Sequence, residues 1–195
     1  MSVTAIRTVV LYIYTVTAVL SGEGYKTLTL TAELKINKAT ITGITLEGAT
    51  FTYDGTAKSI AYVGTLPEGV TAEYAGNGKT EVGDHEVTLT LSGKNYETLT
   101  LKATVKITKA QITGITLADG TYTYQEGVYH SLAISGTLPE GVTVEYTGNN
   151  VTYAGTYTVT ATIKGEGYET LVLTATLVVK ATTGSGGILT PPHEF

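Results

Sequence analysis

The sequence of 195 residues lacks cysteine and tryptophan, and it contains one methionine and four prolines. Without cysteine the chain has no disulfides, no thiolate metal ligands and no thiol nucleophile. Its formal net charge is −5, so it lacks the basic surface that nucleic acid or an anionic membrane attracts. No apolar run reaches the roughly 18 residues that a membrane-spanning helix needs. We therefore expect no nucleic-acid partner and no membrane insertion.

Threonine and tyrosine are abundant instead, with 40 and 14 residues. Both residue types favour strands, and good helix formers are scarce. From Leu99 to Ile107 every second residue is apolar, which is the period of a strand with one buried face. The sequence therefore predicts an all-β protein.

Long segments of the chain repeat at a spacing of 71 to 72 residues. GTLPEGVTAEYAGN at residues 64–77 returns as GTLPEGVTVEYTGN at 136–149, and a closing block occurs three times, at 22–39, 93–110 and 165–181. We therefore predict a partial repeat at 1–39, complete repeats at 40–110 and 111–182, and a flexible tail at 183–195. Residues 1–13 do not match the repeat pattern.

The apolar segment VVLYIYTVTAVLSG at residues 9–22, preceded by Arg7, resembles the core of a secretory signal. From Tyr14 onward, however, it aligns without a gap with the segment that begins at Tyr157, so we interpret it as a strand. Residues 14–39 then supply only the last two strands of a repeat, and an isolated hairpin is marginally stable in water. The next repeat, residues 1–13 or another chain must cover its apolar face. We predict that residues 1–39 form a homo-oligomer contact.

Each complete repeat contains turn signals, such as Pro67-Glu68-Gly69 and Asn77-Gly78, between six or seven short strands. Such spacing is typical of a small antiparallel sandwich, and Asn77-Gly78 suits a type I′ turn. AGTYTV at 154–159 resembles the tyrosine corner of immunoglobulin-like folds, and His85 stands in place of Tyr157 in the other repeat. Because the joint KITKAQITGITL has no proline or serine-rich spacer, we expect tandem immunoglobulin-like antiparallel β-sandwich modules in an extended rod, with an imidazole bond that imitates the corner.

Two motifs suggest catalysis but fail on spacing. GNGKT at 76–80 resembles the end of a phosphate-binding loop, yet Glu73 stands where that loop needs glycine. Glu68 and Glu140 occupy the same turn of separate repeats, too far apart for a glycosidase pair. We expect no catalytic residue.

The three histidines lie at non-equivalent places in the repeats. His130 aligns with Lys58, where we expect an exposed strand position, and His193 lies in the tail. A metal site needs ligands that converge, and these do not. We expect no metal and no cofactor.

Most tyrosines recur at fixed places in the repeats, which indicates a framework role. Tyr122 and Tyr129 are exceptions, because they flank a loop that is one residue longer than its counterpart. They are the candidate ligand-binding residues for a glycan or a host protein.

Four motifs together resemble the bacterial immunoglobulin-like repeats of the YDG/MBG type: YDG at 53–55, GVTVEY at 141–146, AGTYTVT at 154–160 and ITKA at 107–110. The resemblance covers residues 40–182 and, in part, 14–39; His85 and Gln125-Glu126 depart from the pattern. It implies a non-catalytic stalk module of extracellular, adhesin-like bacterial surface proteins, whose partners are adjacent repeats. No signal peptide or LPxTG wall-sorting motif is recognised in the sequence.

Overall fold

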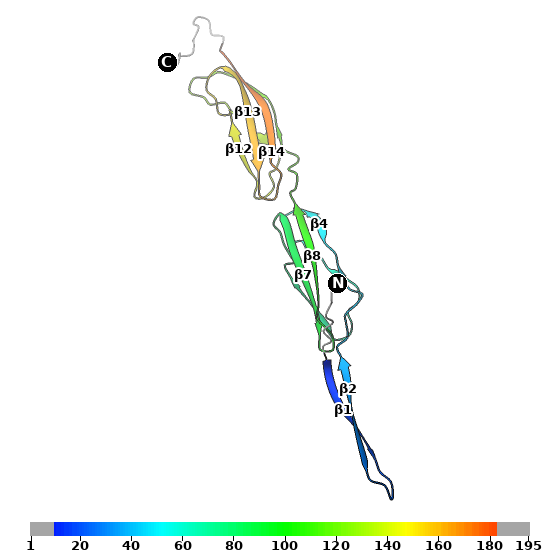
Figure 1. Cartoon of the computed structure of the whole chain (residues 1–195). Helices are drawn as coiled ribbons and strands as arrows, with labels where there is room; N and C mark the ends of the chain where they lie inside the picture. Colours follow the sequence, from blue (N-terminus) through cyan, green and yellow to red (C-terminus); the bar gives the residue numbers. More distant parts are fainter. Residues whose placement is uncertain (1–9, 183–195) are drawn as a thin grey trace, which may run out of the picture. The chain divides into compact units, whose positions relative to one another are not determined.

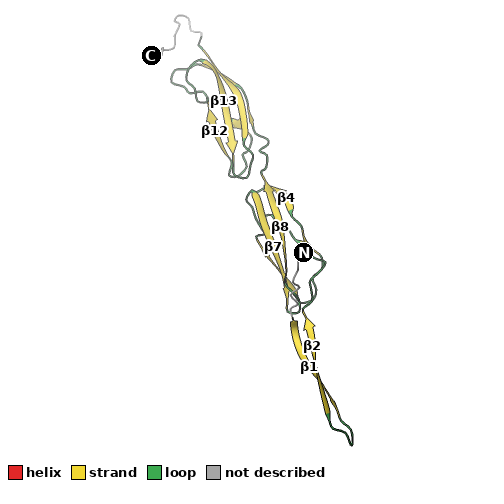
Figure 2. Cartoon of the chain, in the orientation of Figure 1, coloured by secondary structure: helices red, strands yellow, loops and turns green. Residues whose placement is uncertain are grey.

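The computed structural model describes residues 10–182 of the chain. Arg7, His193 and the predicted tail lie outside these residues. The described part contains fourteen strands and no helix (Figure 2), which confirms the predicted all-β class.

The chain divides into two compact units. One comprises Met1–Phe51 and Thr56–Ile107, and the other comprises Thr52–Gly55 and Thr108–Phe195. The first unit begins with a separate hairpin of β1 (Val10–Leu20) and β2 (Leu28–Asn37), which Figure 1 draws in blue.

Each unit holds a six-strand module of the same design, with one four-stranded and one two-stranded sheet. In the first unit the sheet orders are β4-β8-β7-β6 and β3-β5, and in the second they are β10-β14-β13-β12 and β11-β9. The strands of the first module are β3 (Thr45–Leu46), β4 (Ala49–Thr52), β5 (Tyr62–Val63), β6 (Val70–Ala75), β7 (Gly83–Gly93) and β8 (Leu99–Thr108). Those of the second are β9 (Thr116–Leu117), β10 (Gly120–Thr123), β11 (Ile134–Ser135), β12 (Thr143–Thr147), β13 (Gly155–Lys164) and β14 (Leu171–Lys180).

The four-stranded sheet of the second module contains a parallel pair that the sequence did not predict. β10 runs parallel to β14, with Gly120 opposite Leu177, whereas β12–β13 and β13–β14 are antiparallel. Alternation reveals which face of a strand is buried, but it does not identify the strand's partner. The sheet is therefore antiparallel apart from this edge, and the isolated bridge between Ala110 and Tyr168 is also parallel.

The predicted alternation produces the core of each module. Val159, Ala161 and Ile163 of β13 are fully buried, and Leu177 of β14 packs in the same interior. The opposite wall comes from the front of the repeat, where the ITGIT segment supplies Ile112 and Ile115. The first module has the equivalent cluster, formed by Ile41, Ile44, Val70, Leu89 and Leu91. The front and back halves of each repeat thus bury each other.

Repeated polar side chains attach the front half of each module to its sheet. Asn77 accepts a hydrogen bond from the N–H of Ile60 at 3.0 Å and donates to its carbonyl at 2.8 Å. Asn149 makes the same two bonds to Leu132, each 2.8 Å long. The type I′ prediction for Asn77 is wrong: the positive φ angles belong to Gly76 and Gly78, and the amide of Asn77 bonds to the backbone of Ile60, two residues before β5, instead.

The corner hydrogen bond is present in both modules, and it comes from Tyr157 in the second and from His85 in the first. The prediction for His85 is confirmed. The Tyr157 hydroxyl donates to the carbonyl of Tyr153 at 3.0 Å. In the first module Nε2 of His85 lies 2.7 Å from the carbonyl of Glu81, also four residues upstream. Because a carbonyl oxygen can only accept, Nε2 carries the proton.

Replacing Asn77 tests the importance of the double bond to Ile60. Asn77→Ala leaves the N–H and C=O of the buried Ile60 without partners. We therefore expect the free energy of unfolding of the first module to fall by about 1 to 3 kcal/mol. Native-state hydrogen exchange of the β6 and β7 amides in the full chain measures this loss. Asn95→Ala, at an exposed position of the same module, is the control. Equal effects of both changes would contradict the assignment.

Candidate functional site

The loop between Tyr122 and Tyr129 is a turn at one end of the second module. Val128 N–H donates to the carbonyl of Gln125 at 3.2 Å, and Gly127 has a φ of 74°. Tyr122 lies in β10, where its hydroxyl donates to the Ser131 carbonyl at 3.1 Å. The side chain of Tyr129, by contrast, is 64% exposed. Tyr129 is therefore the more accessible of the two candidate residues.

His130 is buried, so the prediction of an exposed position is wrong. Its side chain is 8% exposed, its ring stacks on Tyr122 with centroids 4.9 Å apart, and Nε2 has no hydrogen-bond partner among the described residues. The backbone pairs with Val151 as the aligned Lys58 pairs with Lys79. In the first module, Nζ of Lys58 instead lies 5.9 Å from the centre of the Phe51 ring.

The two modules thus differ by a coupled exchange of residues. In the first module the Lys58 cation lies over the Phe51 ring, whereas in the second module the His130 imidazole stacks on the Tyr122 ring. Alignment of single positions could not reveal this exchange, because the two interacting residues lie seven positions apart in the first module and eight in the second. Comparing Phe51 and Lys58 jointly with Tyr122 and His130 could have found it.

The end of the second module therefore exposes an aromatic surface that we define by Tyr122, Val128, Tyr129 and Tyr153. The antiparallel bridge between His130 and Val151 sets the segments that carry Tyr129 and Tyr153 beside each other. At the aligned positions the first module carries Phe51, Thr56, Ala57 and Glu81. This surface is specific to the second module.

The β1–β2 hairpin is the second candidate, because its core-type residues are exposed. In the part of the chain that the structure describes, β1 and β2 form a two-stranded sheet, and Tyr14 lies opposite Leu34 in the register. Val16, Leu20 and Leu34 are each 52% exposed, whereas the aligned Val159, Ile163 and Leu177 are 0% exposed. The residues have the same character in both places, but no front half of a repeat packs on the hairpin within residues 10–182.

The two faces of the hairpin differ in polarity. Even-numbered positions from Tyr12 to Ile36 in the two strands all carry apolar residues, whereas the opposite face combines Ile13 and Val19 of β1 with Thr29, Thr31, Glu33 and Lys35 of β2. Glu33 and Lys35 form an exposed ion pair at 3.6 Å, which contributes little to stability. The apolar face, which we call the open face, holds no charged residue.

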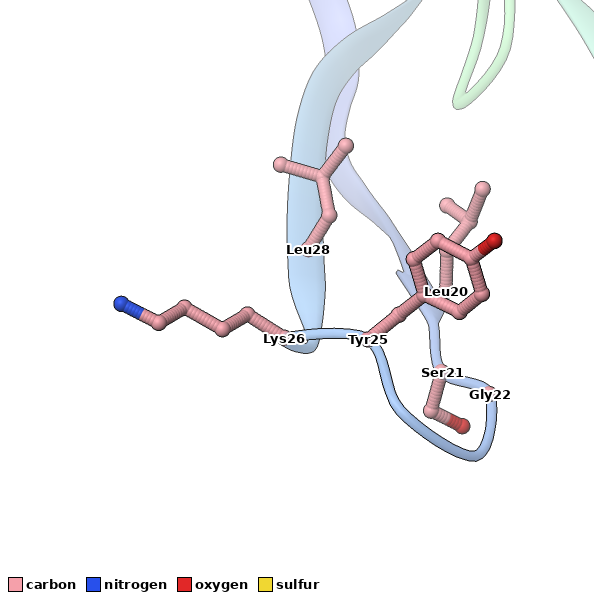
Figure 3. Close-up of a pocket in the computed structure, with 6 residues that line it drawn as sticks. All are labelled: Leu20, Ser21, Gly22, Tyr25, Lys26 and Leu28. Carbon is pink, nitrogen blue, oxygen red and sulfur yellow. The ribbon is translucent and has the colours of Figure 1, made fainter.

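A hollow of about 220 Å³ lies at the tip of the hairpin (Figure 3). Leu20, Gly22, Tyr25 and Leu28 line it, together with Ser21 and Lys26. The Lys26 side chain points away from the Tyr25 ring. The hollow is an open recess at the end of the open face, lined by both apolar and polar groups.

The joint before the second module is short. Ala110 N–H donates to the carbonyl of Gly167 at 2.9 Å, and Glu169 N–H donates to the carbonyl of Ala110 at 2.9 Å. Ala39 makes the same ties to Asn95 and Glu97 in the first module. Between the end of β8 at Thr108 and the tied Ala110 stands Lys109 alone.

Chemical sites were searched across residues 10–182. No cluster of three or more His, Asp or Glu side chains there could hold a metal ion. The same range contains no helix with the length and apolarity to cross a membrane. Glu68 and Glu140 lie in matching turns of the two units, closed by bonds from Val70 to Pro67 and from Val142 to Pro139.

Comparison with solved structures finds fragments of cadherin, protocadherin and titin chains. Drosophila N-cadherin EC1-4 aligns at 12% identity over 82% of this chain and 55% of that chain, with a TM-score of 0.28. Protocadherin PcdhgB3 EC1-4 aligns at 12% identity over 88% and 57%, with a TM-score of 0.30. The titin I-band fragment I67-I69 aligns at 10% identity over 71% and 65%, with a TM-score of 0.29. The chain thus spans less than two thirds of each of these structures.

No curated protein sequence matches the chain significantly. The family model of the MBG domain matches residues 42–111. These residues contain the YDG segment, the first GVT motif and the closing block of the first complete repeat. Residues 42–111 are therefore similar to the MBG domain, as the resemblance of the repeated motifs predicted.

Proposed function

We propose that this chain is a non-catalytic stalk or spacer segment of an adhesin-like protein on the bacterial cell surface, with adjacent repeats as its partners. The MBG domain and the immunoglobulin-like sandwich support a surface module of structural or adhesion type. The observation that carries the stalk role is the joint, in which Lys109 alone separates β8 from the backbone ties of Ala110. A short, tied connection restricts hinge motion, and end-to-end modules with restricted hinges provide reach.

Lengthening the joint tests this role. Inserting Gly-Ser-Gly-Ser between Thr108 and Lys109 adds flexible chain, so we expect a broader distribution of interatomic distances in small-angle X-ray scattering. The same insertion between Gln125 and Glu126 is the control, because it lengthens an exposed loop inside a module. If both variants scatter like the parent chain, the joint does not restrict the modules.

We also propose that the protein self-associates through the β1–β2 hairpin. The open face exposes side chains whose aligned counterparts form the core of a module. Both outer edges of the hairpin lack a partner strand among the described residues. Unpaired edges and a contiguous apolar surface favour association with another chain.

Light scattering on the full chain and on a version that starts at Lys38 tests self-association. We expect a concentration-dependent increase in mass for the full chain only. Leu30→Lys with Leu34→Lys should abolish the increase by placing charges on the open face, whereas Thr29→Lys with Thr31→Lys should preserve it. Monomers of equal solubility in both versions would refute this proposal.

A second candidate function, recognition of a glycan or host protein, is favoured by the aromatic surface around Tyr122 and Tyr129. Exposed aromatic rings can stack on sugars, and the first module has no such surface at the aligned positions. Tyr129 would contact the sugar, and the stacked Tyr122–His130 pair would hold the loop that carries Tyr129 in place.

Glycan binding by the full chain and its variants tests this second function. Because one stacked ring contributes on the order of 1 kcal/mol, Tyr129→Ala should weaken a glycan-array signal by up to about tenfold. Tyr122→Ala should weaken it less. Tyr25→Ala, at an exposed tyrosine in the hairpin, should leave it unchanged. Equal and negligible signals for all chains would exclude glycan recognition.

A further inference from the structure

We propose that Tyr53, which lies between β4 and β5 in the sequence, completes the fold of the second module by packing on the turn of Gly167 and Tyr168. Gly167 is then the residue that makes this turn specific for an aromatic ring. The inference goes beyond the proposed stalk role, because it identifies a contact on which the stability of the second module depends.

The first argument is the unit to which Tyr53 belongs. The second compact unit comprises Thr52–Gly55 together with Thr108–Phe195, so the chain passes from one unit to the other three times. Within the second unit the N–H of Tyr53 donates to the carbonyl of Thr108 at 2.8 Å. The YDG segment therefore folds with a repeat other than the one that surrounds it in the sequence.

The second argument is the contact that the Tyr53 ring makes. It lies edge-on to the Tyr168 ring, with centroids 5.4 Å apart and an interplanar angle of 79°. Aromatic pairs favour such an edge-to-face arrangement. Tyr168 also packs against the core cluster of Ile112, Ile115, Val142 and Ile163. Tyr168 therefore connects Tyr53 with the core of the second module.

The third argument is the glycine next to the ring. A Cβ added at Gly167 would overlap the Tyr53 ring. The φ angle of Gly167 lies outside the left-handed region, so its backbone does not require glycine. The aligned residue of the first module is Asn95, which is exposed, whereas Gly167 is buried. Glycine is therefore needed at position 167 for the close approach of the ring.

The backbone of Gly167 also attaches the segment that precedes β9. Its carbonyl accepts a hydrogen bond from the N–H of Ala110 at 2.9 Å. In the first module Ala39 makes the same bond, also 2.9 Å long, to the carbonyl of the exposed Asn95. We therefore expect the Tyr53 ring to shield the Ala110 bond from water, and the Ala39 bond supplies a reference in the same molecule.

Hydrogen exchange of the full chain tests the inference. Tyr53→Ala removes the ring, so we expect the amides of Ala110, β13 and β14 to exchange up to about tenfold faster. Tyr53→Phe keeps the ring and should preserve slow exchange. The amides of Ala39, β6 and β7 should keep their rates in both variants.

Gly167→Ala tests the same contact from the other side. The added methyl group displaces the Tyr53 ring, so the amides of Ala110, β13 and β14 should again exchange faster. Because both changes remove one contact, the combined effect of Tyr53→Ala and Gly167→Ala should be smaller than the product of the single effects. Asn95→Ala is the matched control in the first module and should leave the exchange of the Ala39 amide unchanged.

Two results would overturn the inference. Faster exchange of the β6 and β7 amides, without a change at Ala110, would assign Tyr53 to the first module. Unchanged exchange after Tyr53→Ala, or fully multiplicative effects with Gly167→Ala, would show that the ring does not stabilise the second module through this turn. The stalk role can fail separately, because the scattering of the variant with a lengthened joint does not depend on these exchange rates.

Discussion

The mutual burial of the two halves of each repeat is the constraint on which this structure depends. The long strands β7–β8 and β13–β14 each present one apolar face, and only the front half of the same repeat covers it. A module of about 70 residues buries only a modest fraction of the surface that its unfolded chain exposes. Each half therefore depends on its apolar contact with the other half. The β1–β2 hairpin shows the consequence, because the same residue pattern is exposed there, where no front half packs against it among the described residues.

Polar side chains fix how the front half lies against the long strands. The two-stranded sheets are only two residues long on each strand, so their backbone ladders supply few bonds. Asn77 and Asn149 each add a donor and an acceptor, and the hydroxyls of Tyr74 and Tyr146 accept from the N–H groups of Tyr62 and Ile134 at 2.8 Å. The repeated motif GVTxEYxGN is therefore a set of attachment points rather than a binding motif.

The candidate sites show where reasoning from sequence succeeds and where it stops. The hydrogen bond of His85 was predictable, because the corner bond is local and spans four residues. The burial of His130 was not predictable, because its ring packs on Tyr122 of β10. Asn77 was misassigned to a turn because the backbone that it binds lies 17 residues away. Each error concerned a partner that is distant in the sequence.

The sequence by itself determined the strand faces, the repeat and the resemblance to the MBG domain, because the period of two and the repeated motifs are properties of local order along the chain. Only the tertiary structure decided which strands pair, including the parallel contact of β10 with β14, and which tyrosines are exposed. It also decided that the core-type residues of the β1–β2 hairpin are exposed. The physical reason is that burial depends on which segments meet in space, and strands with the same alternation can be buried or exposed according to their partners.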